Sequence, residues 1–376
     1  MSRKYTLVIN AGSSSLKFRL FDDDLKSIAE GLVERIGLRG TFVKYNFGRK
    51  EKRIDYQVSN HTDAIEVVVK VLQDNKIDFN LIKKIGHRVV HGGDKFIKPT
   101  LINAKILNEL RKYNALAPLH NPNNIAGIEA CLNLFPQVKN YAVFDTAFHS
   151  TIPEKAYLYP IPYKYYTQKH IRRYGFHGIS NQYVTEEVAK KLKKKQLNII
   201  TCHLGSGCSV TAVEKGKSVD TSMGFTPLEG LMMSSRSGDI DPGVIFKLNY
   251  EGMTVHQIDR MLNFESGLVG VSGLNDMRDI MIANGYKVLG YKSTIKFDPK
   301  KKRLAKIALQ LFVYKIQKYI GAYSAVLGKV DAVVFTAGVG ERNKDVRNLI
   351  MKGINLKTKT LVIPTNEELM IAKLIK

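Results

Sequence analysis

Two segments of the chain repeat one pattern, and this repeat constrains the fold more than any other sequence feature. In the first, an apolar run at residues 5–11 leads into Gly12 and three serines, and an alternating run follows to residue 22. In the second, an apolar run at residues 197–204 leads into a Gly-Ser-Gly turn and further β-type runs to residue 224. Such runs bounded by Gly and Ser predict strands joined by tight turns. Two of these hairpins, about 190 residues apart, predict a duplicated fold, although the spacing exceeds that of short repeat arrays.

The segments between and after the two hairpins alternate between strand and helix patterns. We expect strands at residues 42–47, 52–58 and 141–149, and a strand running into a Gly-rich loop at 82–93. Helices are expected at 61–75, 103–117 and 181–195. A long helix is expected to start at Pro299 and stop at Gly328, followed by a strand and a Gly-rich turn at residues 330–342. Antiparallel meanders combined with βαβ units in two halves predict α/β layers with a central cleft.

Composition excludes several classes of protein. A length of 376 residues favours two domains. No apolar run reaches the 18 or so residues of a membrane span, and the start resembles no signal peptide, so we expect a cytoplasmic protein. The three cysteines form no CxxC pair, which favours reduced thiols. The net charge of +24 is spread over lysine-rich runs without stacking aromatics or zinc-ligand spacing, so nucleic-acid binding is the minority interpretation.

Three glycine-containing turns follow β-type runs, at residues 12–15, 205–207 and 338–341. Each could be a plain structural turn, but the carboxyl ends of strands are also where open α/β sheets bind ligands. None of the three matches the Walker pattern or a GxGxxG start of a βαβ unit. The turns therefore favour a phosphate-binding cleft of another type, with the serines and Lys17 as phosphate ligands.

Charged residues stand at the ends of apolar runs. Arg88 and Asp145 lie next to apolar residues, His177 lies between Phe176 and a glycine, and Arg236 lies in a loop of small residues. A buried Arg88–Asp145 ion pair and a core histidine are the structural alternatives. Taken together, two arginines, a histidine and a lysine supply the positive charge that phosphoryl transfer requires. Asn10, Asp145 and Glu367 are oxygen ligands suited to one Mg²⁺.

Long strings in this sequence resemble acetate kinases. They are VINAGSSSLKF, HRVVHGG, PLHNPNN, FDTAFHSTIP, RRYGFHGIS, SVDTSMGFTPLEGLMMSSRSGDIDPG and VIPTNEEL. The resemblance implies an α/β, two-domain actin-like ATPase (ribonuclease H-like) fold, with a duplicated βββαβαβα core and an interdomain cleft. It implies an N-terminal acyl-kinase domain (1–146 plus 367–376), a C-terminal nucleotide-binding and dimerisation domain (147–366), and a homodimer. The implied reaction is reversible phosphoryl transfer between ATP and acetate by direct in-line transfer, with ATP/ADP as co-substrate and Mg²⁺ (or Mn²⁺) as cofactor.

The same resemblance assigns roles residue by residue. The catalytic residues are Arg88, His120, Asp145, His177 and Arg236. The acetate site is Arg88 with an apolar wall of Val90, Leu119, Phe176 and Pro227. Asn10 and Glu367 are assigned to magnesium. Nucleotide binding falls on Ser13, Ser15, Lys17, His203, Leu204, Gly205, Ser206, Gly207, Asp276, Met277, Arg278, Gly338, Val339, Gly340, Glu341 and Arg342. Acetate is already ionised at neutral pH, so we expect Asp145 to hold Mg²⁺ or orient a donor rather than act as a base.

The chain departs from the family pattern in a few places. Ser206 and Arg342 stand where the family usually has Asn, Asn181 stands where His is usual, and the stretch between residues 353 and 362 is shorter. These departures bear on nucleotide affinity and base preference. Two alternatives stay open: a kinase for propionate or another short-chain acid, and a non-catalytic actin-like nucleotide-binding protein. The presence of Arg88, Asp145, His177 and Arg236 favours a working enzyme.

Overall fold

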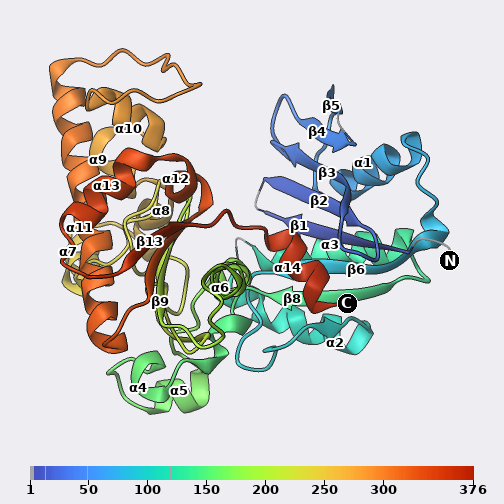
Figure 1. The fold of residues 1–376 in the computed structure, drawn as a ribbon, viewed down its shortest axis with the longest axis horizontal. Coiled ribbons are helices and arrows are strands. Elements are labelled where there is room, and N and C mark those ends of the chain that lie inside the picture. Colours follow the sequence, from blue (N-terminus) through green and yellow to red (C-terminus); the bar gives the residue numbers. More distant parts are fainter. Residues whose placement is uncertain (1–3, 13, 49, 119) are drawn as a thin grey trace. The chain divides into compact units, whose positions relative to one another are not determined.

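The structure is a computed structural model, and it describes residues 4–12, 14–48, 50–118 and 120–376. The chain divides into two compact units. The first consists of Met1–Ser150, Gly178–Tyr183 and Asn366–Lys376, and the second of Thr151–His177 and Val184–Thr365. Each unit is built on its own sheet (Figure 1).

The sheet of the first unit combines an antiparallel meander with parallel strands. Its strand order is β5-β4-β3-β2-β1-β6-β8-β7. The strands are β1 (Tyr5–Ala11), β2 (Ser15–Phe21), β3 (Ser27–Glu34), β4 (Phe42–Phe47), β5 (Lys50–Asp55), β6 (Ile82–Val89), β7 (Thr100–Leu101) and β8 (Lys139–Phe144). Strands β1 to β5 pair antiparallel in sequence order, whereas β1, β6 and β8 are parallel. The predicted N-terminal hairpin is confirmed, and the meander contains one strand, β3, that the sequence did not predict.

Helices cover both faces of this sheet. On one face, Leu7 and Ile9 share a core with α1 (His61–Asp74) and α3 (Asn121–Leu134). On the other face, Val8 packs with α14 (Glu367–Leu374). This alternation along β1 is the period-2 pattern of a strand buried on both sides. The unit also contains α2 (Ala104–Arg111) and the 3₁₀ turns Phe79–Leu81, Lys112–Leu116 and Ala147–Thr151.

The sheet of the second unit repeats the topology of the first. Its order is β11-β10-β9-β12-β13, with β9 (Ile199–Leu204), β10 (Cys208–Glu214), β11 (Lys217–Thr221), β12 (Ala332–Thr336) and β13 (Lys359–Val362). Strands β9 to β11 form an antiparallel meander, and β9, β12 and β13 are parallel. This is the order β3-β2-β1-β6-β8 of the first sheet. The duplicated α/β fold predicted from the two hairpins is confirmed.

Helix α11 (Pro299–Leu327) is the longest helix of the second unit (Figure 1). Its N-cap Asp298 accepts a hydrogen bond from Lys301 N, Pro299 occupies the first turn, and Gly328 ends the helix at a φ of +65°. Both ends agree with the sequence prediction, because Pro and Gly favour these positions. The other helices are α4 (Glu154–Tyr157), α5 (Lys164–Lys169), α6 (Gly178–Leu192), α7 (Pro242–Tyr250), α8 (Val255–Phe264), α9 (Gly267–Ser272), α10 (Met277–Ala283), α12 (Ala337–Arg342) and α13 (Lys344–Lys352).

One local prediction was wrong and four had other bounds, among them the strand expected at 52–58, which is β5. The expected Gly-rich turn at residues 338–342 is the short helix α12. The Glu341 carboxylate accepts hydrogen bonds from Ala337 N (2.8 Å) and Thr365 N (3.0 Å), and Arg347 donates to the carbonyl of Gly340 (2.9 Å). Side chains thus satisfy both ends of this helix. The strand expected at 141–149 ends at Phe144, the helix at 103–117 ends at Arg111, and the helix at 181–195 begins at Gly178.

All three cysteines, Cys131, Cys202 and Cys208, are buried and free, as the sequence indicated. Within the described residues, the helices are too short or too polar to cross a lipid bilayer.

Candidate active site

The first cluster of predicted site residues lies where three parallel strands end. Val8 and Asn10 alternate with Leu7 and Ile9 on β1, so Asn10 lies on the face that α14 covers. On β6, a Cβ at Gly86 would meet two side chains of α14, so Arg88, two residues later, lies on the same face. Asp145 directly follows β8, again two residues after a residue of this face, Val143. Strand alternation therefore brings these three side chains together.

Arg88 is the centre of this cluster. Its Nε donates to Asp145 Oδ2 (3.1 Å), its second terminal nitrogen also contacts that oxygen, and its first donates to Asn10 Oδ1 (3.1 Å). Glu367 lies 3.8 Å from Arg88 Nε. Burial alone would lower the pKa of Arg88, but the carboxylates of Asp145 and Glu367 raise it above its ordinary value. The buried ion pair considered as an alternative for Arg88 and Asp145 is present.

The start of α14 closes the cluster. Asn10 Nδ2 donates to Glu367 (3.3 Å) and to Glu368 (3.4 Å). Asn366 caps the helix by accepting from Leu369 N (3.0 Å), which fixes where Glu367 begins the first turn. Lys17 is paired with Asn10 across β1 and β2, so its exposed side chain lies on the same face.

The cluster has the chemistry of a magnesium site. Asp145 Oδ1 is buried and has no hydrogen-bond partner among the described residues. Such an atom is costly unless a ligand satisfies it. In the described part of the chain, no three His, Cys, Asp or Glu side chains converge on one metal position. Mg²⁺ commonly takes only one or two protein carboxylates and completes its shell with water and phosphate. Asp145 and Glu367 fit that requirement, whereas both amide atoms of Asn10 are already hydrogen-bonded.

The second cluster forms at the end of β9 in the second unit. His177 precedes α6 with a φ of +58°, a conformation that a few non-glycine residues adopt at helix ends. Its Nδ1 is 3.0 Å from Ser209 Oγ, and its ring stacks on His203 with centroids 4.0 Å apart. A Cβ at Gly207 would lie 3.4 Å from His177 Nε2, so the glycine allows the imidazole to approach the turn closely.

Arg236 lies beside the same glycine. A Cβ at Gly207 would be 3.6 Å from an Arg236 terminal nitrogen, and that nitrogen donates to the Pro227 carbonyl (3.3 Å). The loop is held in place because Ser234 N donates to the Ser206 carbonyl (3.1 Å). No carboxylate pairs with Arg236 in the described residues, and burial lowers its pKa. A partly buried guanidinium without an acidic partner is suited to pair with an anion.

Most of the residues predicted for the nucleotide fall on three elements of the second unit. Leu204 and the turn 205–207 pack against α12, where Gly340 would place a Cβ 3.6 Å from Leu204 Cβ. Asp276 caps α10 by accepting from Arg278 N (2.8 Å), and the Arg278 guanidinium hydrogen-bonds the same carboxylate. Met277 is buried and Val339 and Arg342 belong to α12. Glu341 instead hydrogen-bonds the backbone, as described above, so its side chain has a structural role.

The other predicted residues are distributed between the two units. In the first, Val90 is buried beyond the end of β6, Ser15 begins β2, and His120 is the residue before α3. In the second, Phe176 is buried and Pro227 contacts Arg236 through its carbonyl. Ser13 and Leu119 lie outside the described residues.

Four residues that the sequence interpretation missed contact predicted ones. Glu368 accepts from Asn10, Ser209 contacts His177, Arg347 caps α12, and Tyr291 packs its ring 4.0 Å from the Arg278 guanidinium carbon. Glu368 and Ser209 could have been found, because each lies one or two residues from a motif. Tyr291 carries no local signal, since it lies in an irregular segment between α10 and α11.

Two sheets of one topology, each with an arginine-containing cluster near its strand ends, are typical of an actin-like phosphotransferase. Comparison with known sequences agrees with this class. The sequence profile of the acetokinase family matches residues 5–358. The chain belongs to the acetokinase family, and it is therefore an enzyme that transfers phosphoryl groups.

Individual relatives are similar over nearly their whole length. The acetate kinase of Halothermothrix orenii is 46% identical over 401 aligned positions, covering 98% of this chain and 97% of the relative. The acetate kinase of Caldanaerobacter subterraneus subsp. tengcongensis is 47% identical with the same coverage. Among solved structures, a propionate kinase from Francisella tularensis is 40% identical with a TM-score of 0.90, covering 99% of this chain and 98% of that one. Porphyromonas gingivalis acetate kinase is 36% identical with a TM-score of 0.86, covering 99% and 100%.

Proposed function

We propose that this protein is a kinase that transfers a phosphoryl group reversibly between ATP and acetate, giving acetyl phosphate and ADP. Arg236 is the observation that carries the proposal. It is a partly buried guanidinium that has no acidic partner in the described residues and lies beside the same glycine as His177. A transferring phosphoryl group carries negative charge on its equatorial oxygens, which is the charge that Arg236 and His177 could stabilise.

The two clusters have complementary roles in this proposal. Arg88 binds the carboxylate of acetate, because its planar guanidinium can pair with a carboxylate in two places. The acetate oxygen attacks the γ-phosphorus in line, and ADP leaves. No general base is needed, since acetate is ionised at neutral pH. Asp145 orients Arg88 through the hydrogen bonds described above. His120 and the apolar residues Val90 and Leu119 complete the acetate site proposed for the first unit.

Asp145 and Glu367 would hold Mg²⁺, and Asn10 would orient Glu367. Mg²⁺ supplies neutralisation of the phosphate charge when it is bound with the nucleotide. The nucleotide itself would contact residues 203–207, 276–278 and 338–342 of the second unit.

The direct test is ADP formation from ATP and Mg²⁺ in the presence of acetate, propionate or butyrate, with hydroxylamine to trap any acyl phosphate. We expect acid-dependent turnover that is fastest with acetate. Turnover that is fastest with propionate would instead favour the activity named for the Francisella tularensis structure. A difference of one methylene changes the transition-state binding by only about 1–3 kcal/mol, so the apolar wall alone does not decide between them. Absence of acid-dependent ADP formation with any of the three would exclude the proposal.

The role of Arg236 has its own test. We expect Arg236→Ala to lower kcat by about 10²–10³-fold with a smaller effect on the KM for acetate, since the interaction forms chiefly in the transition state. Arg260→Ala is the matched control, because Arg260 is an exposed arginine of α8 in the same unit. Equal kcat values for the two variants would contradict the assignment.

We also propose that the protein works as a homodimer in the cytoplasm. Three apolar side chains of α7 are exposed: Val244, Phe246 and Tyr250 are 43%, 61% and 87% accessible. A cluster of exposed apolar residues of this kind favours a protein interface. The buried, free cysteines agree with a reducing compartment.

A further inference from the structure

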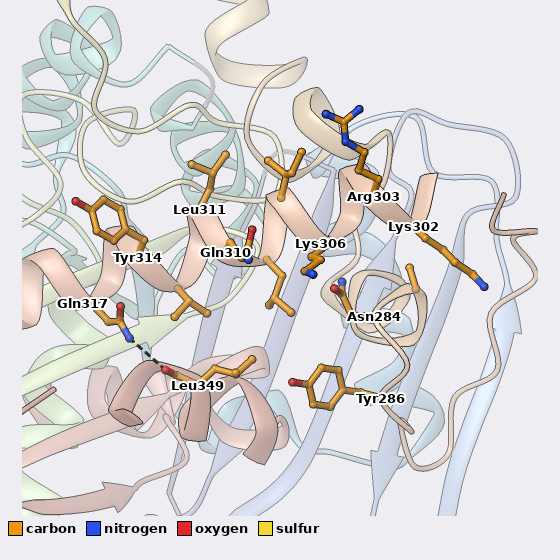
Figure 2. Close-up of a pocket in the computed structure, with 14 residues that line it drawn as sticks. Asn284, Tyr286, Lys302, Arg303, Lys306, Gln310, Leu311, Tyr314, Gln317 and Leu349 are labelled. Carbon is orange, nitrogen blue, oxygen red and sulfur yellow. Dashed lines mark hydrogen bonds between the residues drawn. The ribbon is translucent and has the colours of Figure 1, made fainter. Parts of the chain in front are cut away.

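A cavity of about 950 Å³ lies along α11 in the second unit (Figure 2). It is lined by α11, by the end of α10 with the residues that follow it, and by Leu349 of α13. None of the residues assigned above to acetate, nucleotide or metal lines it. Its volume is in the range of pockets that hold small organic ligands.

One end of the cavity is cationic. Lys302, Arg303 and Lys306 line it near the start of α11, with Asn284 and Tyr286 across from them (Figure 2). These three cations form no ion pair or hydrogen bond with the described residues, although other lysines and arginines of the chain do. None of the lining residues that the structure describes is acidic. The positive charge at this end is thus without a counter-charge from the protein.

The other end of the cavity is largely apolar. Leu311, Tyr314 and Leu349 line it, with Gln317 at its far end (Figure 2). Gln317 Nε2 donates to the carbonyls of Leu349 (3.2 Å) and Ile350 (3.0 Å), which ties α11 to α13 and holds the cavity wall in place. The lining residues of α11 run from 302 to 317, about 22 Å along the helix at 1.5 Å per residue.

We propose that this cavity binds an organic phosphate with an extended apolar body. Clustered lysines and an arginine bind phosphate through charge-assisted hydrogen bonds, and the absence of acidic lining residues favours an anion with more than one negative charge. The aliphatic wall contributes to affinity only if the ligand carries apolar groups beyond its phosphate. The cavity length matches an elongated molecule, with the phosphate at Lys302, Arg303 and Lys306 and the apolar body toward Leu349.

The position of the cavity gives this site a route to the proposed nucleotide residues. Helix α10 begins at Met277, next to Asp276, and its last residue, Ala283, lines the cavity. Helix α13, which carries Leu349, directly follows α12. A ligand that moves either helix end would therefore also act on residues 276–278 or 338–342. The site is separate from the acetate kinase reaction, and its existence does not depend on that function.

The test is calorimetric titration of the full chain with n-octyl phosphate, with excess MgADP present to occupy any nucleotide site. We expect octyl phosphate to bind saturably. Inorganic phosphate, which lacks the apolar body, and octanoate, which lacks the second charge, should each bind at least about tenfold more weakly. The double variant Lys302→Gln/Lys306→Gln should weaken octyl phosphate binding by about tenfold or more. The matched control is Lys300→Gln/Lys301→Gln, two lysines of the same helix that do not line the cavity. The control should change the affinity by less than about twofold.

Three results would overturn the proposal. The first is no saturable binding of octyl phosphate up to about 10 mM, a level at which even a weak specific site is detected. The second is equal weakening by both double variants, which would indicate attraction to the basic surface in general. The third is a combined result: the wild type does not bind octyl phosphate, and the Lys302/Lys306 variant has a different sedimentation coefficient from the wild type. This would show that a second copy of the chain covers this face. Far-ultraviolet circular dichroism establishes that each variant is folded.

Discussion

At the scale of single residues, the two arginines of the clusters differ in their electrostatic surroundings. Arg88 is neutralised within the protein by Asp145, with Glu367 nearby, whereas Arg236 has only carbonyl and thioether contacts in the described residues. The Arg88 guanidinium is therefore held in one orientation, and a ligand carboxylate would bind it while Asp145 is also hydrogen-bonded to it. Arg236 gains its counter-charge only when an anion binds. We infer that the first arginine positions the acceptor and the second responds to charge that develops during transfer.

Removal of Arg88 should affect both acetate binding and stability. We expect Arg88→Ala to raise the KM for acetate and to lower the free energy of unfolding by about 3–5 kcal/mol, because the buried Asp145 carboxylate loses its partner. The double variant Arg88→Ala/Asp145→Asn should recover much of the stability but none of the acetate affinity. Steady-state kinetics and urea unfolding measure the two effects. An acetate KM near the wild-type value in either variant would contradict the assignment of Arg88 to the carboxylate.

His87, the neighbour of Arg88 on the opposite face of β6, should make stability depend on pH. Burial lowers its pKa to about 4, although the hydrogen bond between its Nε2 and Asn140 Oδ1 (2.7 Å) partly opposes this. The unfolded chain takes up a proton near pH 6.5, whereas the folded chain does so only near pH 4, so stability falls as pH decreases through this window. The slope attributable to His87 approaches about 1.4 kcal/mol per pH unit.

The matched variant is His87→Gln, which keeps a polar side chain but does not titrate. We expect it to be less stable than the wild type at pH 7, and the difference between the two proteins to shrink as the pH is lowered to 4.5. His91, whose pKa burial also lowers to about 4, is unchanged in both proteins and cancels in the comparison. Urea unfolding at several pH values gives the difference. A difference that is constant with pH would show that His87 does not titrate in this way.

At the scale of elements, the packing of α14 on the first sheet depends on a glycine. A Cβ at Gly86 would lie 2.6 Å from Ile371 Cγ2 and 2.8 Å from Ile375 Cδ1. Gly86→Ala should therefore destabilise the protein by about 1–3 kcal/mol and displace the helix that carries Glu367. Gly127→Ala in α3 is the control, because its Cβ would meet only Ala11 Cβ at 3.8 Å. The control should be neutral or stabilising by up to about 1 kcal/mol, since alanine favours a helix more than glycine does. Thermal unfolding that ranks the two variants in the opposite order would contradict this packing.

The irregular segment between α10 and α11 should influence nucleotide binding through Tyr291. Its ring packs against the Arg278 guanidinium, and its hydroxyl donates to the Asp279 carboxylate (3.1 Å). We expect Tyr291→Ala to raise the KM for ATP by about two- to fivefold with little change in kcat. This factor corresponds to the free energy of a partly exposed cation–π contact. Tyr291→Phe keeps the ring and should change the KM for ATP less. A KM that is the same in the alanine variant and the wild type would show that Tyr291 does not position Arg278 for the nucleotide.

Elements with strong local signals could be predicted, and those fixed by distant contacts could not. The opening hairpin and α11 were predicted because Gly, Ser and Pro mark their ends. Helix α12 was missed because Arg347 caps its end and because Thr365 holds Glu341, the residue that caps its start. No local pattern shows these contacts. The same holds for the site. Arg88 and Asp145 were predicted from their positions at strand ends, whereas the contact of Asn10 with Glu368 joins residues 358 positions apart.

At the scale of the whole molecule, the proposed homodimer leads to a prediction about its interface. Val244, Phe246 and Tyr250 of α7 are exposed apolar residues, which stable interfaces bury together with a polar rim. We expect the wild type to sediment as a dimer and Phe246→Asp to weaken the association, because a buried charge without a partner costs several kcal/mol. Leu289→Asp is the matched control, since Leu289 is 98% exposed and lies in the irregular segment that follows α10. This control should leave the dimer intact. Sedimentation velocity over a range of concentrations separates the cases: a monomeric wild type excludes the homodimer, and equal behaviour of the two variants excludes α7 as its interface.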